Sequence, residues 1–247
     1  MKYLYYNLLI ITCISVNVYA QDINYDTDEV YNNYTNEISF EVPQILNAVY
    51  QLSYERYIWK NFTANLGIGY KGKEGLVKLS GLDGEHIKTD EIFYTGYQII
   101  PEIRYYLKST ARKPLIGFYF GAYFKYSNYN SDFDGDYINQ YEEHLSFEFD
   151  MSTSVSSVGL MFGYKLPISK HFNIDFMIAG PGAGHYNFKF KNSKDLPDEF
   201  YDDLNEALED YTILDLINSD FKFSKVNRSS KFSAFSFRYG IAIGYMF

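Results

Sequence analysis

Six charged residues have the placement needed for a shared polar cluster. Each lies on the less apolar side of a segment in which apolar and polar residues alternate, a pattern typical of a β-strand with two different faces. The six residues are Glu55, Glu102, Arg104, Lys165, Asp175 and Arg238. Charges that face an enclosed space must be paired, so these residues indicate either a gated ion path or a salt-bridge network that closes an interior.

A second polar group resembles the start of a calcium-binding loop. Residues 130–135 read Asn-Ser-Asp-Phe-Asp-Gly, with oxygen-bearing side chains at the first, third and fifth positions and glycine at the sixth. The twelfth position, where such a loop needs glutamate, is Tyr141. We therefore expect an acidic surface loop. None of the four histidines is at metal-ligand spacing from another, so we expect no metal and no cofactor.

The segment 235–247 shows best how the charged residues are positioned. Its odd positions are aromatic or aliphatic, and its even positions are small or polar, apart from Met246. This predicts a strand with one wholly apolar face that ends on an aromatic residue. Such an ending resembles the C-terminal strand of bacterial outer-membrane barrels, whose insertion machinery reads it. The residues that would carry this barrel-insertion signal are Tyr239, Ile241, Ile243, Tyr245 and Phe247.

Seven earlier segments have the same alternation, which predicts eight strands in total. They cover residues 37–43, 48–55, 62–71, 97–107, 116–124, 157–166 and 172–179. We expect a bulge at Pro101 and another at residues 180–184, at the end of the seventh strand. Short turns follow the second, fourth and sixth strands. Long excursions, at about 72–90, 127–150 and 185–231, follow the third, fifth and seventh.

This layout is typical of an all-β, eight-stranded antiparallel up-and-down transmembrane β-barrel with long extracellular loops. The apolar faces are rich in aromatic residues, and the chain holds 27 Tyr and 21 Phe. The opposite faces carry Gly, Ser, Asn and charge, which suit the small interior of eight strands. We therefore expect the apolar face to meet lipid, with aromatic residues near the short turns. A soluble ligand-binding barrel, with its apolar face inward, is the alternative.

A short helix is predicted in the last excursion. Pro197, Asp198 and Glu199 suit a first helical turn, where donors are missing and negative charge is favoured. Four residues then share one side at helical spacing: Phe200, Leu204, Leu208 and Tyr211. We expect this stripe to pack on the extracellular part of the protein.

The N-terminal residues read as an export signal. Residues 1–20 combine Lys2, an apolar run and Ala20 in the pattern of a cleaved signal peptide. We expect residues 21–36 to be a flexible periplasmic lead-in and residues 37–247 to form the outer-membrane barrel. The single cysteine, Cys13, would leave with the signal peptide. A formal net charge of −9 opposes nucleic-acid binding.

Three segments resemble a family of small Gram-negative outer-membrane barrels, a domain of unknown function, with an architecture similar to the OmpA and OmpX transmembrane domains. They are residues 53–57, 101–107 and 117–121. The resemblance implies a non-enzymatic structural or surface-interaction protein with a closed interior. It also implies outer-membrane lipid, lipopolysaccharide and the barrel-insertion machinery as partners, and a monomeric state. The surface partner stays open.

One enzymatic alternative stays open. His144 and Ser146 are similar to the His-x-Ser pair of outer-membrane lipid A deacylases, which would make the protein a lipid-modifying hydrolase. Both residues fall in the predicted loop at 127–150, where no strand pattern would position an ester. We therefore expect no reaction.

Overall fold

The structure is a computed structural model of the chain. It describes residues 34–75, 84–89, 91, 93–107, 115–139, 141–192, 196–209, 224 and 229–247. The predicted signal peptide and most of the predicted lead-in lie outside these residues. No helix in the described part of the chain is long and apolar enough to cross a membrane.

The described residues form nine strands, one 3₁₀ helix and one α-helix. The strands are β1 (Asn36–Glu41), β2 (Val49–Trp59), β3 (Phe62–Lys71), β4 (Ile87–Thr89), β5 (Phe93–Tyr106), β6 (Gly117–Ile138), β7 (His144–Pro167), β8 (Phe172–Asn192) and β9 (Ser229–Met246). The helices are η1 (Pro43–Asn47) and α2 (Asp198–Glu209). The all-β prediction and the short helix in the last excursion are confirmed.

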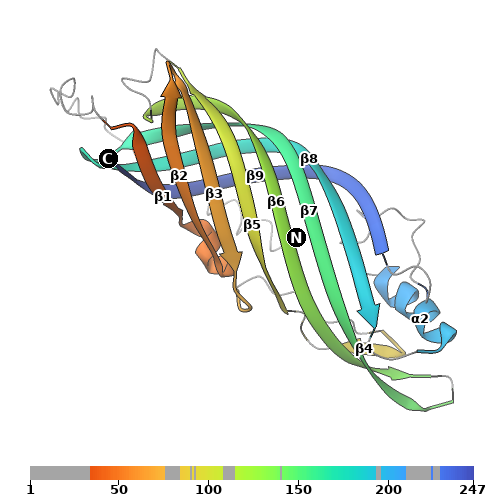
Figure 1. Cartoon of the computed structure of the whole chain (residues 1–247). Coiled ribbons are helices and arrows are strands. Elements are labelled where there is room, and N and C mark those ends of the chain that lie inside the picture. Colours follow the sequence, from red (N-terminus) through yellow and green to blue (C-terminus); the bar gives the residue numbers. More distant parts are fainter. Residues whose placement is uncertain are drawn as a thin grey trace, which may run out of the picture. The chain divides into compact units, whose positions relative to one another are not determined.

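Eight of the strands hydrogen-bond in a closed antiparallel ring (Figure 1). The order around the ring is β1, β2, β3, β5, β6, β7, β8 and β9, and β9 pairs back to β1. The short strand β4, which lies in the predicted excursion at 72–90, adds to the far end of β6. With β4 set aside, each strand of the ring therefore pairs with the strands that come before and after it along the chain, and the last pairs with the first.

Side-chain burial follows the alternation of the sequence. Along β3 every second residue is buried, beginning with Thr63, and the residues between them are exposed. In β9 the even residues from Gly240 to Met246 are buried, while Tyr239 to Phe247 at odd positions are exposed. The ring therefore encloses the small and polar face and turns the aromatic face outward.

The expected bulge at Pro101 is wrong. Pro101 lies opposite Leu66 of β3 in an unbroken ladder. On the β6 side, the pairs Ile99↔Tyr126 and Glu102↔Tyr123 keep one register across it. Proline lacks the N–H donor for one hydrogen bond of the ladder, but the strand has no extra residue at this point.

The bulge predicted at 180–184 lies slightly earlier and inside a strand. The register of β8 shifts between Met177 and Gly180 against β9, and at the matching point against β7. An extra residue there moves the inward face from odd to even positions. The strand does not end at this point but continues to Asn192.

The polar loop predicted at 127–150 is also wrong. Strands β6 and β7 continue as one hairpin to Ile138 and His144, with Asn130 opposite Ser152 and Asp134 opposite Glu148. The long excursion after β8 correspondingly covers 193–228 instead of 185–231. Polar residues on the outer face of a strand beyond the apolar band look like a loop in sequence, which explains both errors.

The helix α2 packs on the inward face of this extended hairpin (Figure 1). Phe200 is fully buried and its ring lies 5.0 Å from that of Phe147 and 5.2 Å from that of Tyr137. The rest of this cluster is apolar or aromatic: Ile87, Phe149, Leu196, Tyr201 and Leu204. Phe200 and Leu204 bear out the predicted stripe, whereas the Leu208 side chain and Tyr211 lie outside the described residues.

A tyrosine joins this cluster to the acidic side of the helix. The Tyr137 hydroxyl donates a hydrogen bond of 2.8 Å to Asp203. Burial, together with this bond to a carboxylate, raises the pKa of Tyr137 above its ordinary value. A raised pKa means that the folded state disfavours the ionised form of Tyr137 more than the unfolded chain does. The site therefore lowers the stability of the fold only above about pH 10, the ordinary tyrosine value.

We predict that Phe200→Ala releases α2 without opening the ring. Removing a buried phenylalanine costs about 3–5 kcal/mol, and here the loss falls on the contacts between helix and hairpin. Limited proteolysis should cleave within α2 faster in this variant, while the strands keep their resistance. Glu206→Ala, an exposed change on the same helix, is the control. Equal cleavage rates in the two variants would contradict the packing.

Candidate functional site

The structure brings all six predicted charged residues into one network inside the ring. Five of them are at most 6 % exposed, and the Arg238 side chain is 10 % exposed. They come from β2, β5, β7, β8 and β9. The network is continuous because every carboxylate in the set bonds at least one of the three cations.

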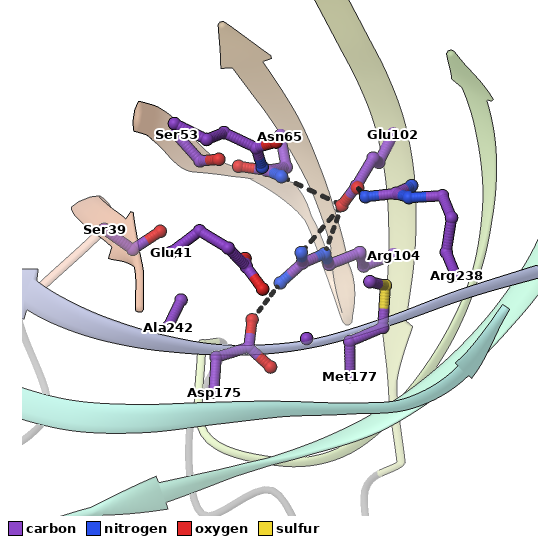
Figure 2. Close-up of a pocket in the computed structure, with 12 residues that line it drawn as sticks. Ser39, Glu41, Ser53, Asn65, Glu102, Arg104, Asp175, Met177, Arg238 and Ala242 are labelled. Carbon is purple, nitrogen blue, oxygen red and sulfur yellow. Dashed lines mark hydrogen bonds and ion pairs between the residues drawn. The ribbon is translucent and has the colours of Figure 1, made fainter. Parts of the chain in front are cut away.

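Arg104 is the centre of the network (Figure 2). Its Nη2 lies 2.7 Å from Glu102 Oε2, and its Nη1 lies 2.6 Å from Asp175 Oδ2 and 3.0 Å from Glu55 Oε2. Its Nε also donates to Glu102, at 2.9 Å. A planar guanidinium with five N–H groups can serve several carboxylates at once, which an ammonium does less well.

Lys165 neutralises a pair of glutamates that face each other. Glu37 of β1 and Glu55 of β2 are direct cross-strand neighbours, a placement that is destabilising for like charges. The Lys165 ammonium lies 2.6 Å from Glu37 Oε1 and 2.6 Å from Glu55 Oε2. Lys165 is 0 % exposed, so the three charges depend on one another.

Neutral side chains complete the hydrogen bonds of the carboxylates. Tyr106 donates to Glu55 at 2.9 Å, and Tyr119 donates to Asp175 at 2.8 Å. Two amides act in the same way, since Asn65 donates to Glu102 at 2.9 Å and Asn173 donates to Glu37 at 2.8 Å. Buried charge is tolerated where both ion pairs and hydrogen bonds are made, as they are here.

Arg238 joins the network through Glu102. Its Nη2 lies 3.0 Å from Glu102 Oε1, and its guanidinium lies 4.5 Å from the centre of the Tyr123 ring. Beside it, a Cβ added at Gly240 would overlap the Glu41 carboxylate, which would have to move aside.

A small cavity lies next to Arg238 and Glu41 (Figure 2). Its volume is about 20 Å³, enough for roughly one water molecule. Among the described residues, Glu41 Oε1 and Arg238 Nη1 are buried atoms without a hydrogen-bond partner, and both residues line this cavity. The cavity is therefore a polar site of the size of a water molecule.

Other predicted chemistry is not assembled. Residues 130–135 lie in strand β6, and the described residues contain no group of three or more His, Cys, Asp or Glu side chains arranged to hold a metal. His144 and Ser146 are both exposed at the start of β7, near the tip of the hairpin. No hydrogen bond joins them in the described structure.

Sequence reasoning missed several members of the network. Glu37 and Glu41 alternate with Ile38 and Phe40, but β1 has only 6 residues, too few for a clear pattern. Tyr106 is two residues beyond Arg104 on the same face, so strand phase alone could have placed it. Asn65 and Asn173 also lie on inward faces, but they are uncharged and alternation alone does not distinguish them from other small or polar residues there.

A closed antiparallel ring with a charged interior and an aromatic exterior defines the structural class of this protein. The chain belongs to the family described as "Protein of unknown function (DUF3575)", whose sequence profile matches residues 7–199. No curated protein matches the chain. Among solved structures, the chain is similar to a major outer membrane protein from Thermus thermophilus, at 13 % identity and a TM-score of 0.37. That match covers 87 % of this chain and 98 % of the other, and a likeness this weak carries no functional weight.

We predict that Lys165→Met destabilises the protein by about 3–5 kcal/mol, because it leaves Glu37 and Glu55 buried without their shared cation. Denaturant unfolding of the protein in detergent or lipid should measure the loss. Lys170→Met, a change in the exposed turn before β8, should have no effect. An unfolding curve for Lys165→Met that overlays the unaltered protein would show that the network does not hold the ring together.

Proposed function

We propose that the protein is a β-barrel of the bacterial outer membrane with a structural or surface-interaction role. In this proposal the ring is a transmembrane barrel, its interior is closed, and it catalyses no reaction. The observation that carries the proposal is a sharp boundary on the outer face of the ring, where apolar side chains give way to polar ones at the same level on four neighbouring strands.

The cross-strand register defines this boundary. One outward row contains Phe124, Val158, Ala183 and Phe235, all of them apolar. The next row contains Tyr126, Ser156, His185 and Ser233, and the one after it contains Asn128, Ser154, Asn187 and Lys231. The outward side chains of four strands thus change from apolar to polar in the same row, as expected at the edge of a lipid layer.

Below the boundary the outer face is apolar and exposed. On β7 the apolar residues run from Val158 to Leu166, close to the roughly 9–11 residues that a tilted strand needs to cross a bilayer. Leu160 is 69 % exposed. Soluble proteins rarely expose a continuous apolar surface of this kind.

Aromatic residues mark the opposite edge of the band, near the short turns. Phe62 packs against Tyr105 at 5.0 Å, Phe118 against Tyr164 at 4.6 Å, and Phe172 against Tyr245 at 5.3 Å. Trp59 is exposed at the β2–β3 turn. Trp and Tyr collect where a membrane meets water, so this ring of aromatics supports the same placement.

The C-terminal residues support export to the outer membrane. Tyr239, Ile241, Ile243, Tyr245 and Phe247 all face outward on β9, as the proposed barrel-insertion signal requires. In this account the apolar band contacts outer-membrane lipid, and the extracellular end meets lipopolysaccharide. The protein is a monomer in the sense that no second copy of the chain joins it in the membrane.

The extended hairpin is the part of the protein that we propose for surface contacts. Its outer face carries acidic residues, and two pairs of them lie directly opposite each other, Asp132 with Asp150 and Asp134 with Glu148. Helix α2 adds exposed acidic side chains at the same end, including Asp198 and Glu199. A surface partner would meet this negative face, while the interior network leaves no path for solutes.

The two alternatives have less support. A soluble ligand-binding barrel would turn its apolar face inward, whereas here the inward face carries the charged network and apolar residues such as Leu160 are exposed. A lipid-modifying hydrolase needs a nucleophile close to acyl chains. Ser146 lies ten residues beyond the Tyr126–Ser156 boundary row on its strand, about 33 Å of extended chain.

We predict that Leu160→Arg destabilises the protein in lipid by about 2 kcal/mol, because a cation inside the apolar band costs about 2–4 kcal/mol at the bilayer midplane and less toward its edge. Asn130→Arg, also exposed and outward but beyond the boundary, should change stability by less than about 1 kcal/mol. Folding equilibria in lipid vesicles, measured over a series of denaturant concentrations, give the change in free energy of unfolding for both variants. Because Leu160 is already exposed, a protein that faced water would tolerate both changes equally, and that result would refute the membrane placement.

A further inference from the structure

Among the described strands, β9 has a neighbour along its full length on only one side. Strand β8 accompanies it from Phe172↔Tyr245 to Lys189↔Ser229. Strand β1 pairs with it only from Glu37↔Met246 to Glu41↔Ala242, after which the chain turns into η1 (Figure 1). Within the described residues, the edge of β9 from Ser229 to Tyr239 has no neighbouring strand on the β1 side.

The hydrogen bonds show which backbone groups this edge presents. Phe247 exchanges bonds of 3.1 and 2.9 Å with Asn36, and the Ile241 carbonyl accepts a bond of 2.9 Å from Val42. Met246 donates in the opposite direction, to the carbonyl of His171. Since alternate residues direct both backbone groups to the same neighbour, the odd residues of β9 face the β1 side.

Three odd residues therefore present unpaired groups. The N–H and C=O groups of Tyr239, Phe237 and Phe235 point to the open edge and have no hydrogen-bond partner among the described residues. Their side chains are 70 %, 53 % and 72 % exposed on the outward aromatic face. This edge therefore belongs to the same band that we propose faces lipid.

An open edge is costly at that depth. Lipid offers no hydrogen bonds, so each unpaired backbone group costs several kcal/mol, and sheets that span membranes close their edges for this reason. This step rests on the proposed membrane location, because an edge in water would be solvated. In the bilayer these groups need a partner, and only another backbone can satisfy them all.

We propose that the β9 edge between Ser229 and Tyr239 is a docking site for a β-strand of another protein, which adds in line with β1. Such a strand would run antiparallel to β9, as β1 does. Its outward residues would be apolar, next to Phe235 and Phe237, and its inward residues small or polar, next to Ala234 and Ser236. Backbone bonds supply the affinity in this mode of recognition, and side-chain alternation supplies the specificity.

The interior next to the edge has matching chemistry. Glu41 is the last residue of β1, and Arg238 lies on β9 just above the last β1 pair. Glu41 Oε1 and Arg238 Nη1 are the two unpartnered atoms at the small cavity. At the end of the added strand next to β1, a polar side chain that faces inward would lie near the Arg238 Nη1 donor and the Glu41 Oε1 acceptor.

A second copy of this chain fits the edge less well. Two copies inserted with the same orientation are related by a rotation about the membrane normal. That rotation places the two β9 strands parallel and turns one sheet over. The aromatic face of one copy would then continue as the polar interior face of the other, so we assign the edge to a different chain.

Residue-resolved hydrogen exchange of the protein refolded in detergent micelles tests the proposal. The probe is a synthetic peptide with the sequence of residues 62–71, in which apolar residues alternate with small or polar ones. In the protein these residues form β3, which runs in the same direction as β1. In the free protein, the amides of Phe235, Phe237 and Tyr239 should exchange at least ~10-fold faster than those of Ser236 and Arg238, which face β8. Saturating peptide should slow the first set by ~10-fold or more.

Two proline variants sharpen the test. Phe237→Pro removes a donor from the open edge only, so the variant should fold normally and lose the response to the peptide. Ser236→Pro removes a donor that serves β8 and should prevent stable folding. Normal peptide protection in Phe237→Pro would overturn the proposal.

The remaining outcomes separate this proposal from the proposed function. Protection of the three amides in the free monomer would mean that the chain covers its own edge, and protection only in a dimeric fraction would mean that a second copy does. Either result overturns the proposal. The proposal is also overturned if the peptide gives no protection to a protein that still shows the membrane-barrel signature, a difference in SDS-gel mobility between boiled and unboiled samples. Loss of that gel shift itself would instead overturn the membrane location on which the proposal rests.

Discussion

The structure depends on the neutralisation of buried charge by Arg104. Its guanidinium bonds Glu55, Glu102 and Asp175, which come from three different strands. Without this cation Asp175 would lose its ion pair, and Glu55 and Glu102 would keep only Lys165 and Arg238. Buried carboxylates that are short of positive charge cost more than the bonds themselves return. The interior is thus held by charge where a soluble protein would use an apolar core. This arrangement leaves the apolar side chains free to face outward.

The outer surface and the interior place different demands on the same strands. Below the row of Tyr126 and Ser156 the outward residues are apolar, and beyond it they are polar or acidic while the pairing of β6 and β7 continues. The extended hairpin therefore needs a core of its own, which Phe200 and its neighbours on α2 provide. On the other side of the ring β1 ends at Glu41, so among the described residues β9 has neighbours on both sides only at its turn end. This unequal height leaves an edge of β9 without a neighbouring strand in the described part of the chain.

The fold was largely predictable from sequence where alternation was unbroken. Residues 62–71 were predicted as a strand, and β3 has those bounds, because each apolar residue there is followed by a small or polar one. The hairpin beyond Ser127 was missed because its outer residues are polar like those of a loop. The contacts of Arg104 were not predictable in detail. They join residues 49 and 71 positions apart, and their pairing depends on how the ring closes, which no single strand encodes. Glu37 was overlooked because β1 is too short to show its phase.

The central claim is that the aromatic face meets lipid and the charged face fills the ring. The most direct test is to refold residues 21–247 with and without detergent and to compare boiled and unboiled samples on an SDS gel. The account predicts a heat-dependent change of mobility in the detergent preparation and aggregation without detergent, because the exposed apolar band needs an amphiphile to cover it. A protein that is folded and monomeric without detergent would contradict the account, since its outer face would then be stable in water.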